Sequence, residues 1–304
     1  MRQDAARHRL AGWSYGFILI VATGSTGNIG SELLRLLAAA GADTRAIYHH
    51  VESAARPAHI TFFKADLADP LQAEAALVGA FSVFLLTGNA PGFRDSQITV
   101  VEAAQRRGIR HLVKLSALGA SDHSKSGIGR DHWAVEQAIQ RTSMPWTILR
   151  PHAFMQNWLK DVAASVRTEN TIYSPIGGGR MPFIDTRDIA AVAAEVLLHP
   201  DPHIGKKYVL TGGEAVGYAD LAAELTKVTG RAIAYRPISM EEARARLTRL
   251  GQPASLIDAT LAIAAYQRDG GPTALVSPTV ERLLGRPPRT IRDFVRDYAA
   301  EFIR

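Results

Sequence analysis

The chain alternates short apolar runs with longer segments in which apolar residues recur every three or four positions. The first run, 17–22 (FILIVA), is too short to cross a membrane and has the length of a strand buried on both faces of a parallel sheet. After it, Ile29, Leu33 and Leu37 recur at helical spacing, and Gly41 stands where a helix C-terminus favours glycine. The pattern therefore opens with a strand, a loop and a helix.

The same alternation continues to residue 150. Further strands are expected at 44–48, 59–64, 81–87, 111–116 and 146–150, and helices at 70–77, 96–107 and 130–141. Strands that alternate with helices at these lengths predict a parallel sheet covered on both faces, which is a Rossmann-type, doubly wound α/β fold.

Beyond Pro151 the alternation ends and the pattern becomes mostly helical. Helices are expected at 185–198 and 219–228, and three more open at Ser239, Ser277 and Thr290. We therefore predict a smaller, mostly helical C-terminal cap at the carboxyl edge of the sheet, where open α/β sheets bind ligands. The expected divisions are an N-terminal extension (1–16), a sheet domain (17–152, with 184–199 returning to it) and a substrate-binding cap (153–183 and 200–304).

Composition excludes several kinds of site. The chain has 304 residues, of which 47% are hydrophobic, so it is long enough to bury a large core. It has no cysteine, which excludes disulfides, thiolate metal sites and a cysteine nucleophile. His199 and His203 have a metal-like spacing, but Pro200 and Pro202 break the helix that would bring the two rings together. No metal site is expected.

Charge and hydropathy indicate which classes of binding partner can be expected. No apolar stretch reaches transmembrane length and the chain starts with a polar segment, so we expect a cytoplasmic protein without a membrane partner. The net charge is +6, but the basic residues are spread along the chain, which is typical of a solvated surface and not of a nucleic-acid interface. The expected partner is a small-molecule substrate, and the protein is expected to be a monomer or a homodimer.

A G-x-x-G-x-x-G loop lies between the first strand and the first helix. Its residues are Gly24, Ser25, Thr26, Gly27, Asn28, Ile29 and Gly30. Glycines at this spacing allow backbone to approach phosphate closely, and the N–H groups at the start of the next helix favour an anion. The motif alone is weak, and a plain strand–turn–helix is the alternative, but the flanking strand and helix are the context that it needs. We predict that the N–H groups of Thr26 to Ile29 face a dinucleotide pyrophosphate.

Several further motifs follow in a fixed order. They are 65–67 (ADL), 84–87 (FLLT), 113–117 (VKLSA), 132–136 (HWAVE), 145–151 (PWTILRP) and 284–290 (LGRPPRT). With the glycine loop, they make the chain resemble, from about Ile18 to Phe302, the NmrA-like group of atypical short-chain dehydrogenase/reductases. That group includes triphenylmethane reductase, bacterial quinone and azo-dye reductases, and a redox-sensing regulator. The resemblance implies a nicotinamide cofactor and a reductase activity.

The resemblance places further cofactor contacts after the third and fourth strands. Asp66 and Leu67 occupy the position that contacts adenine in similar proteins. Thr87, Gly88 and Asn89 would lie along the ribose and the nicotinamide. The alternative for Asp66 is a loop carboxylate that caps its own turn.

The choice between NADP and NAD depends on the end of the second strand, where an acid bonds the ribose 2′-hydroxyl and an Arg accommodates a 2′-phosphate. No acid follows the strand directly, and His49 stands where the family commonly carries Arg. Arg45 and Arg56 would add positive potential, whereas Glu52 would favour NAD if it reached the ribose. We expect NADP(H) to be preferred over NAD(H).

The proton donor of ordinary short-chain reductases is missing, because none of the eight tyrosines has a lysine four residues later. His132 stands where related isoflavone-reductase-like enzymes hold a catalytic Lys, and Glu136, one turn later, would orient its imidazole. Ser116 matches the substrate-side Ser of short-chain reductases. The alternatives are a packing role for His132 and a turn-satisfying hydroxyl for Ser116.

Four residues after the sixth strand fall where nicotinamide and substrate would meet. They are His152, Phe154, Met155 and Trp158. Aromatic and thioether side chains suit a flat, apolar acceptor, and ordinary core packing is the alternative.

These features predict an NAD(P)H-dependent oxidoreductase that transfers hydride to a small conjugated or carbonyl substrate, such as a quinone, an azo dye or an enone. One alternative is an NAD(P)-sensing regulatory protein without hydride transfer, which the missing Tyr-x-x-x-Lys keeps open. Another is a non-redox isomerase or lyase on the same fold.

Overall fold

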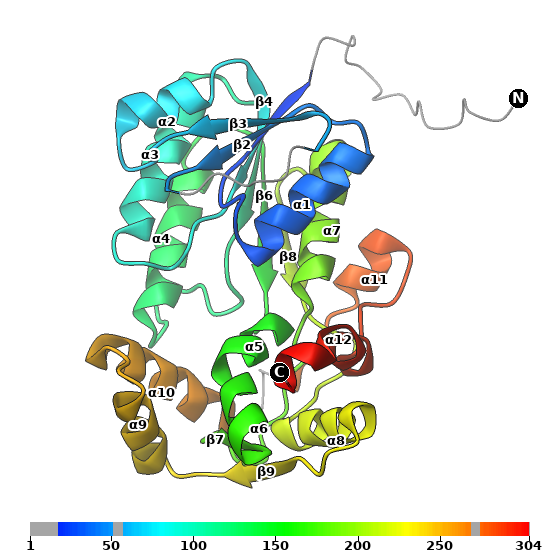
Figure 1. Ribbon diagram of the computed structural model, residues 1–304. Coiled ribbons are helices and arrows are strands. Elements are labelled where there is room, and N and C mark those ends of the chain that lie inside the picture. The colour runs from blue at the N-terminus through cyan, green and yellow to red at the C-terminus, as the bar shows by residue number, and fades with distance from the viewer. Residues whose placement is uncertain (1–17, 51–56, 269–273, 304) are drawn as a thin grey trace, which may run out of the picture.

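The computed structural model describes residues 18–50, 57–268 and 274–303, and a seven-stranded sheet runs through its upper part (Figure 1). The strands are β1 (Leu19–Ala22), β2 (Thr44–Tyr48), β3 (Ile60–Lys64), β4 (Ala80–Leu85), β5 (His111–Leu115), β6 (Trp146–Pro151) and β8 (Lys206–Leu210). All neighbours are parallel, in the order β3-β2-β1-β4-β5-β6-β8. The predicted Rossmann-type sheet is confirmed, while the expected extension (1–16) lies outside the described residues.

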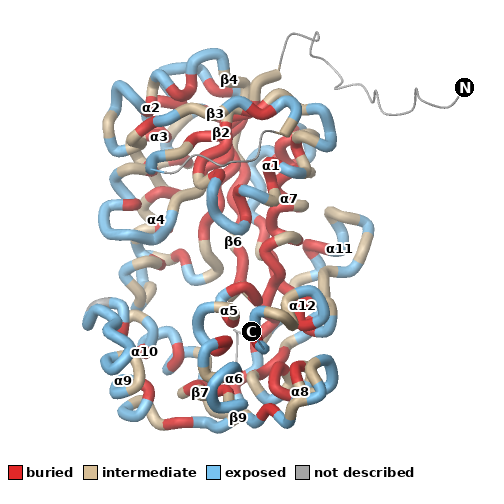
Figure 2. The backbone as a smooth tube through the Cα atoms, viewed as in Figure 1, coloured by how far each residue is buried: buried red, intermediate tan, exposed pale blue. Residues whose placement is uncertain are grey.

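Helices cover both faces of the sheet, and its central strands are mostly buried (Figure 2). On one face lie α1 (Asn28–Ala39) and α7 (Thr186–Leu198), and on the other lie α2 (Pro70–Ala76), α3 (Phe93–Arg106) and α4 (Gly127–Gln140). Ile20 belongs to the apolar cluster under α1, and its neighbour Val21 to the cluster under α3. This alternation is why the first strand is apolar at every position.

Most of the chain after β6 forms the predicted helical cap, whereas β8 joins the main sheet and α11 (Thr279–Leu284) packs on α7 and β8. The cap elements are α5 (Trp158–Asp161), α6 (Ala163–Glu169), β7 (Thr171–Ser174), α8 (Tyr218–Thr229), β9 (Ala234–Pro237), α9 (Met240–Arg249), α10 (Ala254–Arg268) and α12 (Ile291–Tyr298). The sequence pattern missed the small parallel sheet of β7 and β9. Within the described residues, no helix is both long and apolar enough to cross a membrane. The division into domains stays a prediction.

Local side-chain chemistry fixes several helix ends. Asp69 accepts hydrogen bonds from the N–H groups of Leu71 and Gln72, with Pro70 at the first helical position, as predicted for α2. The α3 helix begins at Phe93, before the predicted residue 96. Gly92, with a φ of 85°, turns the chain there and directs Phe93 into the core.

A buried carboxylate holds the C-terminal segment on the sheet domain. Asp188 of α7 is 0% exposed and accepts a hydrogen bond from the N–H of Arg289 (2.6 Å) and another from Arg286 Nη2 (2.7 Å). The Arg289 guanidinium also bonds to it. Two guanidinium groups therefore compensate a charge that would be costly to bury alone.

We predict that Asp188→Asn lowers the free energy of unfolding by about 2 kcal/mol, because both guanidinium groups lose their counter-charge. Urea denaturation measures the change. The matched control is Asp258→Asn, which removes an ion pair with Arg244 whose side chains are 64% and 52% exposed. That change should cost less than about 1 kcal/mol. Equal losses in the two variants would contradict the assignment.

Candidate functional site

The glycine loop joins β1 to α1 where the strand order reverses. β1 pairs with β2 on one side and with β4 on the other, and ligands of open α/β sheets bind at such a switch point. Thr23 fixes the two strand ends, because its Oγ1 donates to the carbonyl of Leu86 (2.7 Å) and accepts from the N–H of Leu86 (2.8 Å). The loop therefore starts at the carboxyl edge of the sheet between β1 and β4, a position called the crevice below.

Two of the loop glycines are required by backbone contacts. A Cβ on Gly30 would lie 2.1 Å from the carbonyl oxygen of Gly24, and a Cβ on Gly24, whose φ is +65°, would lie 2.7 Å from that of Leu86. Glycine at these positions lets the first turn of α1 lie directly against the end of β1. Gly27 differs, since its φ is −84° and the nearest atom to an added Cβ is 3.6 Å away. The protein itself has room for alanine there.

The start of α1 has the properties of a phosphate site. Thr26, Gly27 and Asn28 are exposed, and no side chain caps this helix, so its first-turn N–H groups have no acceptor from within the helix. Ser25 and Ile29 are buried, and Ser25 Oγ donates to a carbonyl of β2 (2.6 Å). These two residues can offer main-chain groups only. The loop thus fits a dinucleotide pyrophosphate, which its N–H groups would hold.

His49, Asp66 and Leu67 lie where β2 and β3 end. His49 Nε2 is 3.8 Å from Asp66 Oδ2, and both side chains are about half exposed. Asp66 Oδ1 accepts from the N–H of Ala68 (2.9 Å), so this carboxylate does cap its own turn. Leu67 packs against the core under α3. Contact of Asp66 and Leu67 with adenine stays a prediction.

Arg45 does not face the same region. Its Nη1 donates to the carbonyls of Ala76 and Val78, both at 2.8 Å, and its guanidinium lies over the ring of Phe63. The arginine therefore stabilises the end of α2. Arg56 and Glu52 lie outside the described residues.

Thr87, Gly88 and Asn89 continue from β4 along the other side of the crevice. Thr87 Oγ1 accepts a hydrogen bond from Nε2 of Gln97 (2.6 Å), a fully buried residue of α3. Gly88 and Asn89 are exposed. The hydrogen bond fixes the start of this segment and leaves its tip accessible.

The predicted catalytic histidine has an unexpected neighbour. His132, on α4, is 5% exposed and points toward the sheet, as expected. Its Nδ1 lies 3.2 Å from Nζ of Lys114, a residue of β5 that is 0% exposed. The ammonium also bonds to the carbonyl of Leu115. Lys114 was not among the predicted site residues, although a lysine inside a buried apolar strand is itself a signal of function.

Burial shifts the pKa values of both groups. It lowers the pKa of Lys114 to about 7, with the charge of Glu136 acting in the opposite direction. Burial, and then the positive charge of Lys114, lower the pKa of His132 to about 3. At neutral pH the imidazole is therefore uncharged, and the proton of the pair resides on the lysine.

Glu136 does not orient His132, contrary to the sequence-based expectation. Its Oε1 accepts from Ser116 Oγ (2.5 Å) and from Arg150 Nε (2.9 Å), and its Oε2 accepts from Arg150 Nη2 (2.5 Å). Lys207 lies 3.6 Å away on β8. A fully buried carboxylate requires such charged partners, so it turns toward β6 and away from the imidazole.

Ser116 takes part in the same network. It is 5% exposed, and its hydroxyl donates to Glu136 and not to a turn carbonyl. The substrate-side role of Ser116 stays a prediction. While that bond persists, Ser116 can accept a hydrogen bond but cannot donate one to a substrate carbonyl.

The four predicted substrate residues divide into two groups. Met155 and Trp158 are 3% and 1% exposed and belong to the core of the cap, where Trp158 packs against Phe183 and Phe294. For these two residues the structure favours core packing. Phe154 is half-buried, and His152 is buried with Nδ1 accepting from the N–H of Ala153 (2.7 Å). Substrate contact stays a prediction.

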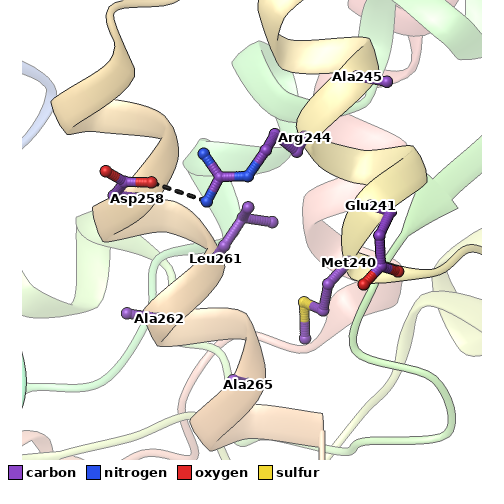
Figure 3. Close-up of a pocket in the computed structure, with 8 residues that line it drawn as sticks. All are labelled: Met240, Glu241, Arg244, Ala245, Asp258, Leu261, Ala262 and Ala265. Carbon is purple, nitrogen blue, oxygen red and sulfur yellow. Dashed lines mark hydrogen bonds and ion pairs between the residues drawn. The ribbon is translucent and has the colours of Figure 1, made fainter.

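A pocket of about 590 Å³ lies entirely within the cap, between α9 and α10 (Figure 3). The bond from Arg244 Nη2 to Asp258 Oδ1 (2.7 Å) crosses between the two helices. No residue of the glycine loop or of β5 lines this pocket, so it is separate from the crevice. Over the residues that the structure describes, no group of His, Asp or Glu side chains could hold a metal ion.

Comparison with known proteins gives a consistent result. A model of the NmrA-like family matches residues 18–278. The chain is 35% identical to the NAD(P)H azoreductase of Xenophilus azovorans, over 93% of this chain and 99% of the relative. It is 33% identical to (4-alkanoyl-5-oxo-2,5-dihydrofuran-3-yl)methyl phosphate reductase of Streptomyces griseus, over the same shares of the two chains.

A solved structure extends this similarity to the fold. The NADPH-dependent quinone oxidoreductase QOR2 of Escherichia coli, crystallised with NADPH, superposes with a TM-score of 0.81. The two chains are 26% identical, and the match covers 91% of this chain and 99% of that one.

The low pKa of Lys114 predicts that the free energy of unfolding depends on pH. Between pH 7 and 9 the unfolded chain keeps a proton that the folded chain releases, because the lysine pKa is about 7 when folded and about 10.4 when unfolded. The free energy of unfolding should therefore rise with pH over this window. In Lys114→Met this contribution is absent, so the stability of the variant relative to the wild type should fall by about 2 kcal/mol from pH 7 to 9. Urea denaturation at the two pH values measures it, and a pH-independent difference would refute it.

Proposed function

The chain belongs to the NmrA-like family and is an NAD(P)H-dependent oxidoreductase, and from this premise we propose that it uses NADPH to reduce a small, planar, conjugated acceptor. The observation that carries the proposal is the close contact of Gly30 with Gly24, which sets an uncapped helix start against the end of β1. A dinucleotide pyrophosphate is the ligand that such a loop fits best.

We assign the two sides of the crevice to the two halves of the cofactor. Asp66 and Leu67 would border the adenine, and His49 would meet the ribose 2′-phosphate. Thr87, Gly88 and Asn89 would border the nicotinamide, which supplies a hydride to the acceptor when the cofactor is bound. An imidazole N–H can donate a hydrogen bond to a phosphate oxygen, so His49 supports NADP over NAD.

The acceptor class follows from the chemistry that the relatives' names describe. An azo compound, a quinone and an oxo-dihydrofuran each contain a conjugated double bond that is reduced by a hydride and a proton. A half-buried Phe154 and a buried His152 after β6 would provide a flat wall for such a molecule.

The proton would come from His132, because it is the predicted catalytic residue with an ionisable neighbour that can supply one. Ser116 and Glu136 would act as positioning residues, since their hydroxyl and carboxylate bond to each other and to Arg150. This bonded network holds α4 on the sheet and thereby places His132.

The pyrophosphate assignment predicts that Gly27→Ala weakens NADPH binding without unfolding the protein. The added methyl has room in the protein, with its nearest atom at 3.6 Å, but it would stand where the phosphate approaches the backbone. We expect the Kd for NADPH, measured by calorimetry, to rise by about tenfold or more, with a thermal midpoint within about 2 °C of the wild type. Gly178→Ala is the control, since this exposed residue of the cap is far from the loop in the sequence and an added Cβ would have no atom within 4 Å. An unchanged Kd in Gly27→Ala would contradict the assignment.

The reductase assignment predicts that the protein oxidises NADPH, faster than NADH, when a quinone, an azo dye or an enone is added. Loss of cofactor absorbance with equimolar reduced product measures the reaction. A sensor would instead bind the dinucleotide and leave it reduced with every acceptor in the panel. Conversion of an acceptor without cofactor oxidation would indicate an isomerase or lyase.

A further inference from the structure

Lys114 carries a buried charge that has no carboxylate of its own. Its Nζ contacts the carbonyl of Leu115 and Nδ1 of His132. Glu136 is the nearby acid, but its two oxygens accept from Ser116 and Arg150. An ammonium in this position is costly, and methionine would fill similar space without that cost.

The other groups around this lysine do not supply a counter-charge either. From α3, Phe93 packs with ring centroids 5.0 Å from His132. From β6 and β8, Arg150 and Lys207 are cations that face Glu136. In the described part of the chain, the lysine therefore has one ionisable contact, the imidazole.

The geometry also orients the imidazole. A lysine ammonium can only donate, so Nδ1 of His132 is the acceptor in this contact and the ring proton is on Nε2. Among the described residues, Nε2 has no hydrogen-bond partner in the protein. The histidine can therefore lose a proton at Nε2 and gain one at Nδ1 in the same event.

We propose that Lys114 is the proton reservoir of the reduction and that it acts through His132, an inference that rests on the proposed reductase function. When a hydride has reached the acceptor, the resulting anion takes the proton of His132 Nε2 as the lysine proton moves to Nδ1. The acceptor then carries one hydride and one proton, the cofactor is oxidised and the lysine is a neutral amine. A solvent proton that arrives at Nε2 after product release restores the pair by the reverse path.

Lys114 is thus a positioning and proton-storing residue, while His132 meets the substrate. A histidine whose pKa is about 3 is a poor proton store at neutral pH, because almost none of it is protonated. The neighbouring lysine, with a pKa of about 7, is protonated in a large share of the molecules under the same conditions. Lys114 would therefore store the proton, and His132 would pass it on.

The test compares wild type, Lys114→Met, His132→Gln and the double variant, with a quinone as acceptor. Wild-type kcat should fall above pH of about 7, as the lysine loses its proton. Lys114→Met should lower kcat at pH 6.5 by about tenfold or more and remove this pH dependence, with little change in the Kd for NADPH. Because the two residues act as one unit, the double variant should be no slower than the slower single variant.

Two further variants separate proton storage from a simple hydrogen bond and from an unspecific effect of removing a lysine. Lys114→Gln, which retains a polar side chain, should be as slow as Lys114→Met if proton storage matters, and near wild type if only a hydrogen bond to His132 is needed. Lys227→Met, which removes a lysine that is 63% exposed, should be indistinguishable from wild type. Wild-type rate and pH dependence in Lys114→Met, or additive losses in the double variant, would overturn the proposal. Failure of the wild type to oxidise NADPH with any acceptor would instead overturn the reductase function.

Discussion

The close approach of α1 to the end of β1 is the constraint from which the rest of the site follows. Gly30 can carry no side chain because the carbonyl of Gly24 would lie 2.1 Å from its Cβ. This contact sets the free N–H groups of the helix over the crevice between β1 and β4. A dinucleotide held there extends along the carboxyl ends of the central strands, toward β5 and the residues that follow it. The position of the phosphates thus determines where the chemistry can occur.

Two separate polar networks contact the buried face of α4. His132 and Glu136 lie one helical turn apart, yet their side chains turn to different strands: the imidazole to Lys114 on β5, the carboxylate to Arg150 on β6. In the second network Arg150 and Lys207 compensate the charge of Glu136, and the bonds stabilise the packing of the helix. The first contains Lys114, whose burial lowers its pKa to about 7 although the charge of Glu136 acts in the opposite direction. A group that titrates near neutral pH at the carboxyl edge of a sheet is suited to proton transfer.

Much of this organisation could be predicted from the sequence, because it depends on local pattern. The apolar run before Gly24 and the helical spacing after it determine the first strand and helix, and Asp69 with Pro70 determines the start of α2. What could not be predicted depends on contacts between distant segments. The pairing of β7 with β9 joins residues about sixty positions apart, and nothing in either strand specifies the partner.

The predicted catalytic residues also depend on contacts between distant segments, which the sequence pattern does not specify. His132 and Glu136 share a helical face in sequence, which suggested that they contact each other, but the strands beneath offer stronger partners to each. Lys114 was visible within its apolar strand, but its contact with His132 required the packing of α4 on β5. Likewise the position of Arg45 on β2 suggests a neighbour of the cofactor, whereas its guanidinium bonds to carbonyls at the end of α2.

Hydride transfer at this site is tested most directly by the fate of deuterium placed at both C4 positions of NADPH during reduction of an enone. The deuterium should be found at a single, non-exchanging carbon of the product, and the second hydrogen should come from solvent. Label recovered in water, or product whose two new hydrogens both come from solvent, would contradict hydride transfer at this site.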